Sequence, residues 1–266
     1  MSFEPSNLAL SMATGAAAGV VGCFAVMRRM TLAADAMSHM ALPGIGIAIV
    51  ARIHPILGAA TALLLGALLV WRLETKTGMA TETVVGVVFS VALAIGGMIT
   101  PGEELIEALF GGSGPATFLE TAVGIFGSAA VAGLVLRDKD RLVLALVSPE
   151  IARAAGVDVA RLNLRFLVLF ALTIALGLRY SGALLIGSLI IIPAVTAKRV
   201  ARNLTGMLVI AAIVSTVSTT GGALAASLVR REAGPLVVVV AGACFVASLF
   251  FPKAGARVPR AARVLF

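Results

Sequence analysis

Apolar stretches follow one another along the whole chain and are separated by short polar or charged segments. The apolar residues within them do not alternate with polar ones as they do in β-strands; residues 59–70, for example, are alanine, leucine and valine broken by one threonine and one glycine. These stretches therefore predict helices of the length that crosses a bilayer, roughly 20 residues each. We predict nine spans, with eight or ten also compatible with the pattern, at about 7–27, 31–51, 55–71, 80–100, 116–136, 163–178, 181–197, 204–229 and 234–251. The sixth and seventh are short and nearly continuous, so they are either tilted spans or a broken helix with a re-entrant half.

The composition places these helices in a membrane. Sixty per cent of the residues are hydrophobic, 13% are charged, and the mean hydropathy is +1.07, whereas soluble domains carry about 25% charged residues. A membrane β-barrel is disfavoured because its strands alternate apolar and polar positions. We therefore expect an all-α, polytopic membrane protein in which residues 1–266 form a single transmembrane domain in the lipid bilayer.

The distribution of charge predicts the orientation of the chain. With nine spans and the N-terminus outside, 17 of the 21 basic residues fall on the cytoplasmic side, where lysine and arginine accumulate in membrane proteins. The remaining four are Arg52, Arg179, Arg230 and Arg231, on the outer side. These four either dock acidic patches of an external protein or are exceptions to the rule. The net charge of +8 is thus interpreted as topology and not as a sign of nucleic-acid binding.

A short cytoplasmic helix is predicted between the fifth and sixth spans. Ser148 is a suitable N-cap, Pro149 suits the first helical position, and Glu150 suits the first turn. Gly156 can end the helix. The segment is either an ordinary capped loop helix or a knob that docks into a cytoplasmic partner.

Asp35 and His39 are ionisable residues within the second apolar run. At a spacing of four they lie one turn apart on the same face of a helix. A carboxylate at this depth is costly and normally faces a partner or a water-filled path. Oxygen and imidazole nitrogen together suit Mn²⁺, Fe²⁺ or Zn²⁺. The alternatives are a hydrogen-bonded Asp–His pair that ties spans together, or a proton relay.

Other residues near this pair carry weaker signals. Met37 and Met40 are soft donors, although methionine in a membrane helix usually packs. Pro43 and Gly44 predict a local break in the second span, and Pro193 a similar one in the seventh. The sequence contains no phosphate-binding GxxxxGK[ST] loop and no HExxH motif, so ATP, if it drives this protein, is bound by another chain.

Four ordered motifs resemble the metal-ion permease family of ABC transporters, which import zinc, manganese or iron. They are residues 28–44 with Asp35 and His39, residues 83–90 followed by 109–111, residues 149–156, and residues 182–197. The resemblance runs along nearly the whole chain.

This resemblance implies a permease in the bacterial inner membrane that imports a divalent transition metal and holds no permanent cofactor. Its implied partners are a second copy of the chain, cytoplasmic ABC ATPase subunits and an extracytoplasmic metal-binding protein. Asp35 and His39 would lie on the metal path, and residues 149–156 would be the coupling helix that contacts the ATPase, with Glu150, Ala152 and Gly156 as the coupling residues.

Three other functions remain to be distinguished. An ion-coupled secondary transporter would use Asp35 and His39 as a proton relay and would need neither a coupling helix nor ATPase chains. A membrane scaffold would not need two polar groups on one face at this depth. An ABC permease for a metal chelate would have a wide apolar path and no reason for an Asp–His pair.

Overall fold

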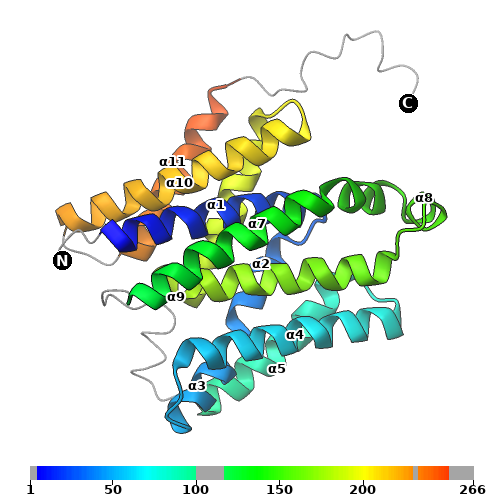
Figure 1. Ribbon diagram of the computed structural model, residues 1–266, viewed down its shortest axis with the longest axis horizontal. Helices are drawn as coiled ribbons and strands as arrows, with labels where there is room; N and C mark the ends of the chain where they lie inside the picture. The colour runs from blue at the N-terminus through cyan, green and yellow to red at the C-terminus, as the bar shows by residue number, and fades with distance from the viewer. Residues whose placement is uncertain (1–4, 100–116, 230–232, 252–266) are drawn as a thin grey trace.

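The computed structural model describes residues 5–99, 117–229 and 233–251 (for residues 5–6 and 179–184, the backbone only), and every regular element in these ranges is an α-helix (Figure 1). The all-α prediction is therefore confirmed. The helices are α1 (Pro5–Met27), α2 (Thr31–His39), α3 (Leu42–Val50), α4 (Pro55–Thr77), α5 (Thr81–Ile99), α7 (Phe118–Val147), α8 (Pro149–Ala154), α9 (Val159–Val200), α10 (Leu204–Val229) and α11 (Ala233–Leu249).

Helix α1 lies in the middle of the bundle and packs against α7, α9 and α10 (Figure 1). Two of its glycines permit this close packing. A Cβ atom at Gly19 would lie 2.5 Å from the carbonyl oxygen of Ala211 in α10, and one at Gly22 would collide with the carbonyl oxygen of Ile190 in α9. Small residues that let helix backbones approach are the usual basis of packing inside a membrane. α1 is thus the central helix of the bundle.

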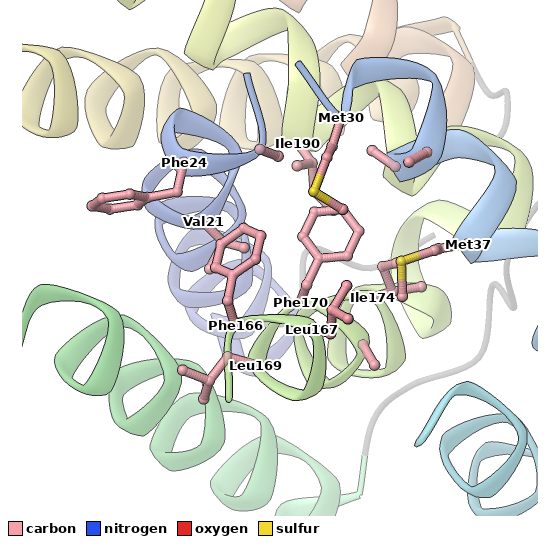
Figure 2. Close-up of a cluster of buried hydrophobic side chains, with 14 of the residues drawn as sticks. Val21, Phe24, Met30, Met37, Phe166, Leu167, Leu169, Phe170, Ile174 and Ile190 are labelled. Carbon is pink, nitrogen blue, oxygen red and sulfur yellow. The ribbon is translucent and has the colours of Figure 1, made fainter. Parts of the chain in front are cut away.

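A cluster of large side chains fills the space between α1, the start of α2 and α9. Figure 2 shows Val21 and Phe24 of α1 beside Phe166 of α9, with Met30 pointing toward Phe170. The rings of Phe166 and Phe170 lie 5.9 Å apart between centroids. These side chains are at most 3% exposed. The cluster fixes the first part of α9 against the connection from α1 to α2.

The second predicted span is broken, as Pro43 and Gly44 indicate. α2 ends at His39, residues 40–41 form a turn, and α3 begins at Leu42. Pro43 has no N–H group to donate to the carbonyl of His39, so the helical ladder cannot continue across this point. Gly44 lets α3 touch α4, since a Cβ atom there would lie 2.5 Å from the Cβ of Ala62. The break displaces α3 from the line of α2 without ending the span.

The sixth and seventh predicted spans belong to one helix that bends sharply. α9 runs through both, but a Cβ atom at Gly177 would lie only 4.0 Å from the Cβ of Ile186. Nine residues of straight helix would separate these positions by roughly 13 Å. We call residues 159–177 the first arm of α9 and residues 186–200 the second arm. The second arm continues through Pro193, so the predicted break at that residue is wrong. Membrane helices tolerate an internal proline when neighbouring groups satisfy the freed carbonyl.

The predicted spans differ from the helices chiefly at the polar ends. Within the described residues, seven helical segments are long and apolar enough to cross a membrane, the α2–α3 pair counting as one, and α11 is a shorter apolar helix. The count of nine stays a prediction. α7 extends beyond the predicted boundary at 136 to Val147 and carries the charged residues 137–141 in its last turns. Asp138 there is 8% exposed and lies 3.8 Å from Arg165 of α9, which explains why a charged stretch remains ordered helix.

The connections gather at two ends of the bundle. One end, which we call the α8 end, brings together residues 28–30, the α4–α5 turn, the end of α7, α8 and the start of α9 around a shared cavity. The α3–α4 turn lies at the opposite end, where His54 Nε2 approaches Glu120 Oε1 of α7 at 3.6 Å. Figure 1 shows these two ends at the right and the left of the bundle. Residues 28–30, the α4–α5 turn and the connections on either side of α8, which are predicted to share the cytoplasmic side, therefore share one end, while the orientation of that end in the membrane stays a prediction.

Candidate metal path and coupling site

Helix α2 has two unlike faces. One face is buried and consists of Ala33, Ala34, Met37 and Ser38. Figure 2 shows Met37 pointing into the core near Ile174, and Met40 beyond the end of α2 is 2% exposed. These two methionines are therefore core residues, as the packing interpretation predicts. On the other face Leu32 is 75% exposed, Asp35 is exposed and His39 is half-buried.

Asp35 lies against the second arm of α9 at a glycine. A Cβ atom at Gly187 would lie 2.8 Å from the Asp35 Cα and 3.1 Å from its carboxylate oxygen Oδ1. The backbone carbonyl of Asp35 accepts a hydrogen bond from Ser38 Oγ at 2.7 Å, which fixes that turn of α2. Among the described residues no cation lies within ion-pair distance of the carboxylate. Asp35 is thus positioned by backbone packing, and its exposed side chain is accessible to a ligand.

His39 has a buried ring nitrogen with no partner. Its Nδ1 makes no hydrogen bond in the described part of the protein, and its ring lies 5.8 Å from that of Phe89 in α5, centroid to centroid. A buried nitrogen without a partner is costly unless a ligand or water uses it. No group of three or more His, Cys, Asp or Glu side chains among the described residues is placed to hold a metal. A metal at Asp35 and His39 would therefore need water or another chain to complete its shell.

The helix predicted at residues 149–156 is present as α8, which is shorter and ends at Ala154, and it has the predicted N-cap. Ser148 Oγ accepts the N–H of Ile151 at 3.3 Å, and Pro149 occupies the first turn. Gly156 has φ +78°, a left-handed conformation that favours glycine. Ala152 is fully buried, so it anchors α8 to the bundle, whereas Glu150 is exposed and Ile151 is 60% exposed. Glu150, Ile151 and Arg153 are thus among the side chains of α8 that are available to a partner.

Beside α8 lies a polar junction of three side chains. The Arg28 guanidinium donates from Nη1 to Asn163 Oδ1, and Asn163 Nδ2 donates to Glu74 Oε2 at 2.7 Å. The Cζ atom of Arg28 also lies 4.5 Å from the centroid of the Phe166 ring. Burial lowers the pKa of Arg28 to about 10, although the nearby Glu74 carboxylate opposes the change. The guanidinium therefore remains charged at neutral pH.

Comparison with known proteins identifies the family. The family model described as the ABC 3 transport family matches residues 3–252. The chain belongs to this family. Over 237 residues it is 33% identical to the high-affinity zinc uptake system membrane protein ZnuB of Haemophilus influenzae, an alignment that covers 86% of this chain and 90% of that protein.

Two further members lie close to this ABC 3 chain. The manganese transport system membrane protein MntC of Listeria monocytogenes is 29% identical over 259 residues, with 96% of this chain and 92% of that protein covered. The solved structure of PsaBC from Streptococcus pneumoniae in complex with Fab superposes with a TM-score of 0.82 at 25% identity, over 95% of this chain and 92% of that chain. The predicted resemblance to metal-ion ABC permeases is therefore confirmed.

Membership of an ABC transport family has general consequences for this chain. It is a multi-pass membrane protein of a transport system, and such systems work with an ATPase and a substrate-binding protein. The motif at residues 109–111 lies outside the described residues.

The four basic residues predicted on the outer side are only partly described. Arg52 is exposed, has φ +56° and follows α3 at the end opposite α8. Arg230 and Arg231 lie outside the described residues, as does the side chain of Arg179. The structure thus describes the side chain of one of the four, and its position on the outer side stays a prediction.

The polar junction was not predicted from the sequence. Arg28 was assigned to a motif, but Asn163 and Glu74 lie 135 and 46 positions away from it, so no spacing rule connects them. The available signal was that Asn163 and Glu74 are polar residues at the very ends of apolar runs, where a helix leaves the membrane.

Proposed function

We propose that this chain is the permease subunit of an ABC importer in the bacterial inner membrane that moves a divalent transition metal, Mn²⁺, Zn²⁺ or Fe²⁺, into the cytoplasm. The observation that carries the proposal is the pair Asp35 and His39 on the less buried face of α2, with no partner for the His39 Nδ1 among the residues that the structure describes. A resident cofactor is not required, because the metal is the cargo.

The chemistry of the pair suits a transient metal site. A hydrated dication cannot cross hydrocarbon, so fixed ligands must replace part of its water shell along the path. One carboxylate and one imidazole are too few for a closed tetrahedral site. A weak site of this kind allows release, which an importer needs. The relatives named for zinc and for manganese are similarly distant, so the identity of the ion rests on the measurement below.

We propose that a second copy of the chain supplies a second Asp–His pair across a two-fold axis. The outward face of the α2–α3 span supports this, since Leu32, Ile47 and Val50 on it are between 55% and 75% exposed. Two carboxylates and two imidazoles would then surround one ion. The mass of the protein purified in detergent shows whether it is a dimer. A protein that is monomeric in this measurement and still imports metal in cells would contradict the proposed dimer.

The proposed partners contact opposite ends of the chain. ATP hydrolysis resides in separate cytoplasmic subunits, which receive α8 with Glu150 and Gly156 and with Ala152 as its buried anchor. The outer arginines Arg52, Arg179, Arg230 and Arg231 face the extracytoplasmic metal-binding protein.

Arg52 gives the docking proposal a clean test. Because its φ is left-handed, replacement by glycine removes the charge and also removes backbone strain. Arg52→Gly should weaken capture of the binding protein and reduce its salt dependence while the permease stays at least as stable. Unchanged affinity would rule out Arg52 as a docking residue.

The experiment that tests the function is metal accumulation in cells that lack this chain, complemented with variants, with Mn²⁺, Zn²⁺ and Fe²⁺ measured in parallel. Asp35→Asn keeps the shape and removes the charge, and His39→Leu removes the nitrogen donor. Each should abolish uptake without preventing membrane insertion or assembly with the ATPase. A structural Asp–His pair predicts lower expression, with the surviving protein still transporting.

Matched controls come from the same chain. Asp140→Asn removes an exposed carboxylate of α7, and His54→Leu removes the other imidazole, which lies at the opposite end from α8. Both should import at close to the parent rate. Uptake that continues when the ATPase is inactivated would favour a secondary transporter instead. If Asp35→Asn and His39→Leu accumulate and import normally, the metal path lies elsewhere.

A further inference from the structure

A large cavity at the α8 end joins the coupling helix to the start of α2. It has a volume of about 870 Å³, and its lining includes Arg28, Glu74 and Asn163 of the polar junction together with Arg153 and Gly156 beside α8. The junction therefore stands between the two segments that the proposed function needs to connect.

The junction holds three elements that are remote in sequence. Asn163 accepts from Arg28 with its carbonyl oxygen and donates to Glu74 with its amide nitrogen, so one neutral side chain bridges a cation and an anion. All three side chains are partly buried, where such bonds are stronger than in water and a lost partner is costly. Arg28 precedes α2, Asn163 belongs to α9, and Glu74 belongs to α4.

On one side the junction continues to α8 through short hydrogen bonds. Val157 N donates to Ala152 O at 2.9 Å, which ties the α8–α9 connection to α8. Asp158 caps α9 by accepting the N–H of Arg161 at 3.0 Å. Trp71 Nε1 donates to Ala160 O at 2.8 Å, so α4 holds the first turn of α9, directly before Asn163. Only a few hydrogen-bonded residues separate α8 from Asn163, so we expect a movement of α8 to move Asn163 as well.

On the other side the junction continues to the metal ligands. Arg29 has φ +61°, a strained conformation for a residue other than glycine, and Met30 N donates to Ala25 O at 2.9 Å to close the end of α1. Ala34 N then donates to Met30 O at 3.1 Å as the first turn of α2 begins. Asp35 thus lies just over one helical turn from Met30, and the guanidinium of Arg28 is the polar side chain that, together with the apolar packing of Met30, holds this start to α9.

We propose that Arg28, Asn163 and Glu74 are positioning residues that transmit the displacement of α8 to α2 and so couple ATP hydrolysis to the state of the Asp35–His39 site. This inference rests on the proposed function. It predicts that damage to the junction leaves both the metal ligands and the ATPase contact in place but raises the amount of ATP hydrolysed per ion moved.

The test uses the full complex in lipid vesicles and exchanges the charges of the junction. Asn163→Asp sets a second carboxylate beside Glu74, and Glu74→Gln leaves Arg28 without its buried counter-charge. Each should raise the number of ATP molecules hydrolysed per metal ion by roughly two- to thirtyfold, because substitutions along a coupling path typically change the coupling between two sites by about that factor. The double variant Asn163→Asp with Glu74→Gln restores one cation, one carboxylate and one amide. Its ratio should return to within about twofold of the parent.

Arg72→Gln is the matched control, because Arg72 belongs to α4, as Glu74 does, and its side chain is exposed. It should leave the ratio unchanged. A ratio that is unchanged in both single variants, or raised in the double variant as in the singles, would overturn the proposal. Wild-type vesicles that import none of the three metals would instead overturn the proposed function.

A second measurement needs no variant. In the wild-type complex, binding of a non-hydrolysable ATP analogue should change the hydrogen exchange of residues 156–163 and of residues 28–35 together, with no matching change in α11. If hydrogen exchange changes at residues 156–163 but not at residues 28–35, the junction does not transmit the displacement of α8 to α2. This result would overturn the proposal even if every variant failed to assemble.

Discussion

At the scale of single residues, the position of the proposed metal ligand Asp35 depends on Gly187, because glycine has no side chain to keep α2 away from α9. Gly187 leaves room for the backbone of Asp35, and a Cβ atom there would lie 2.8 Å from the Asp35 Cα, a separation that real structures do not tolerate. The neighbour that would have to move is backbone and not a flexible side chain. α2 would therefore shift as a unit.

We expect Gly187→Ala to reduce metal uptake strongly. Overpacking of this kind costs roughly 1–3 kcal/mol, and each 1.4 kcal/mol or so that falls on the transport step lowers its rate about tenfold. Initial uptake rates, normalised to the amount of protein in the membrane, measure the effect. Gly86→Ala in α5 is the control, because a Cβ atom there meets nothing within 4 Å. Equal uptake by the two variants would remove Gly187 from the site.

The sequence predicts some of these residues and not others for a physical reason. Asp35 and His39 could be found because a charge in an apolar run is expensive, so its presence alone is informative. Gly187 carries no such signal, since glycine is common in membrane helices. Its role follows only from the close approach of α2 to the second arm of α9.

At the scale of helices, the local rules worked where the backbone decides. Ser148, Pro149 and Gly156 define the ends of α8 without reference to anything distant, and Pro43 defines the break between α2 and α3. At the sharp bend in α9 such rules went only part of the way. The apolar runs at 163–178 and 181–197 predict either two tilted spans or a broken helix with a re-entrant half, and the packing of Ile186 against Gly177 decides how the helix bends.

We expect Gly156→Val to uncouple ATP hydrolysis from metal import. Gly156 has φ +78° and open space around its Cα, so valine meets no clash and instead imposes backbone strain of about 1–2 kcal/mol or more next to α8. ATP hydrolysis and metal import, measured on the same vesicles, should separate while the protein remains assembled.

The comparison for Gly156 is another left-handed glycine. Gly78→Val carries similar strain, because Gly78 has φ +67° and also has open space, but Gly78 belongs to the α4–α5 turn on the same cavity and not to the segment that connects α8 to α9. Gly156→Asn should recover much of the coupling, since asparagine tolerates this conformation. If Gly78→Val uncouples as strongly as Gly156→Val, strain at this end and not the coupling helix is responsible.

At the scale of the whole molecule, the outer surface of the bundle is that of a lipid-embedded protein. Large apolar side chains are exposed on helix after helix, among them Leu65 of α4, Phe126 of α7 and Leu224 of α10, each between 51% and 76% exposed. In water such a surface would drive aggregation. The composition of the chain predicted the lipid environment. The packing of the helices against one another could not be predicted from composition, because it depends on the close contacts that Gly19 and Gly22 of α1 make with α10 and α9.

The segregation of charge makes a definite prediction about orientation. The segments rich in arginine and lysine meet at the α8 end, and the α3–α4 turn lies at the other end beside Glu120. The rule that basic residues face the cytoplasm therefore places α8 inside and residue 53 outside. Ile53 is 55% exposed and Thr77, at the end of α4, is also exposed, so cysteines at these positions can react.

We expect a membrane-impermeant maleimide to label Ile53→Cys in intact cells and Thr77→Cys only after the membrane is opened. The background carries Cys244→Ser and keeps Cys23, which is buried. Cells without the ATPase subunits keep the α8 end uncovered, so a lack of labelling at Thr77→Cys cannot come from a bound partner. Labelling of Thr77→Cys in intact cells would reverse the orientation, and with it the assignment of α8 to a cytoplasmic ATPase.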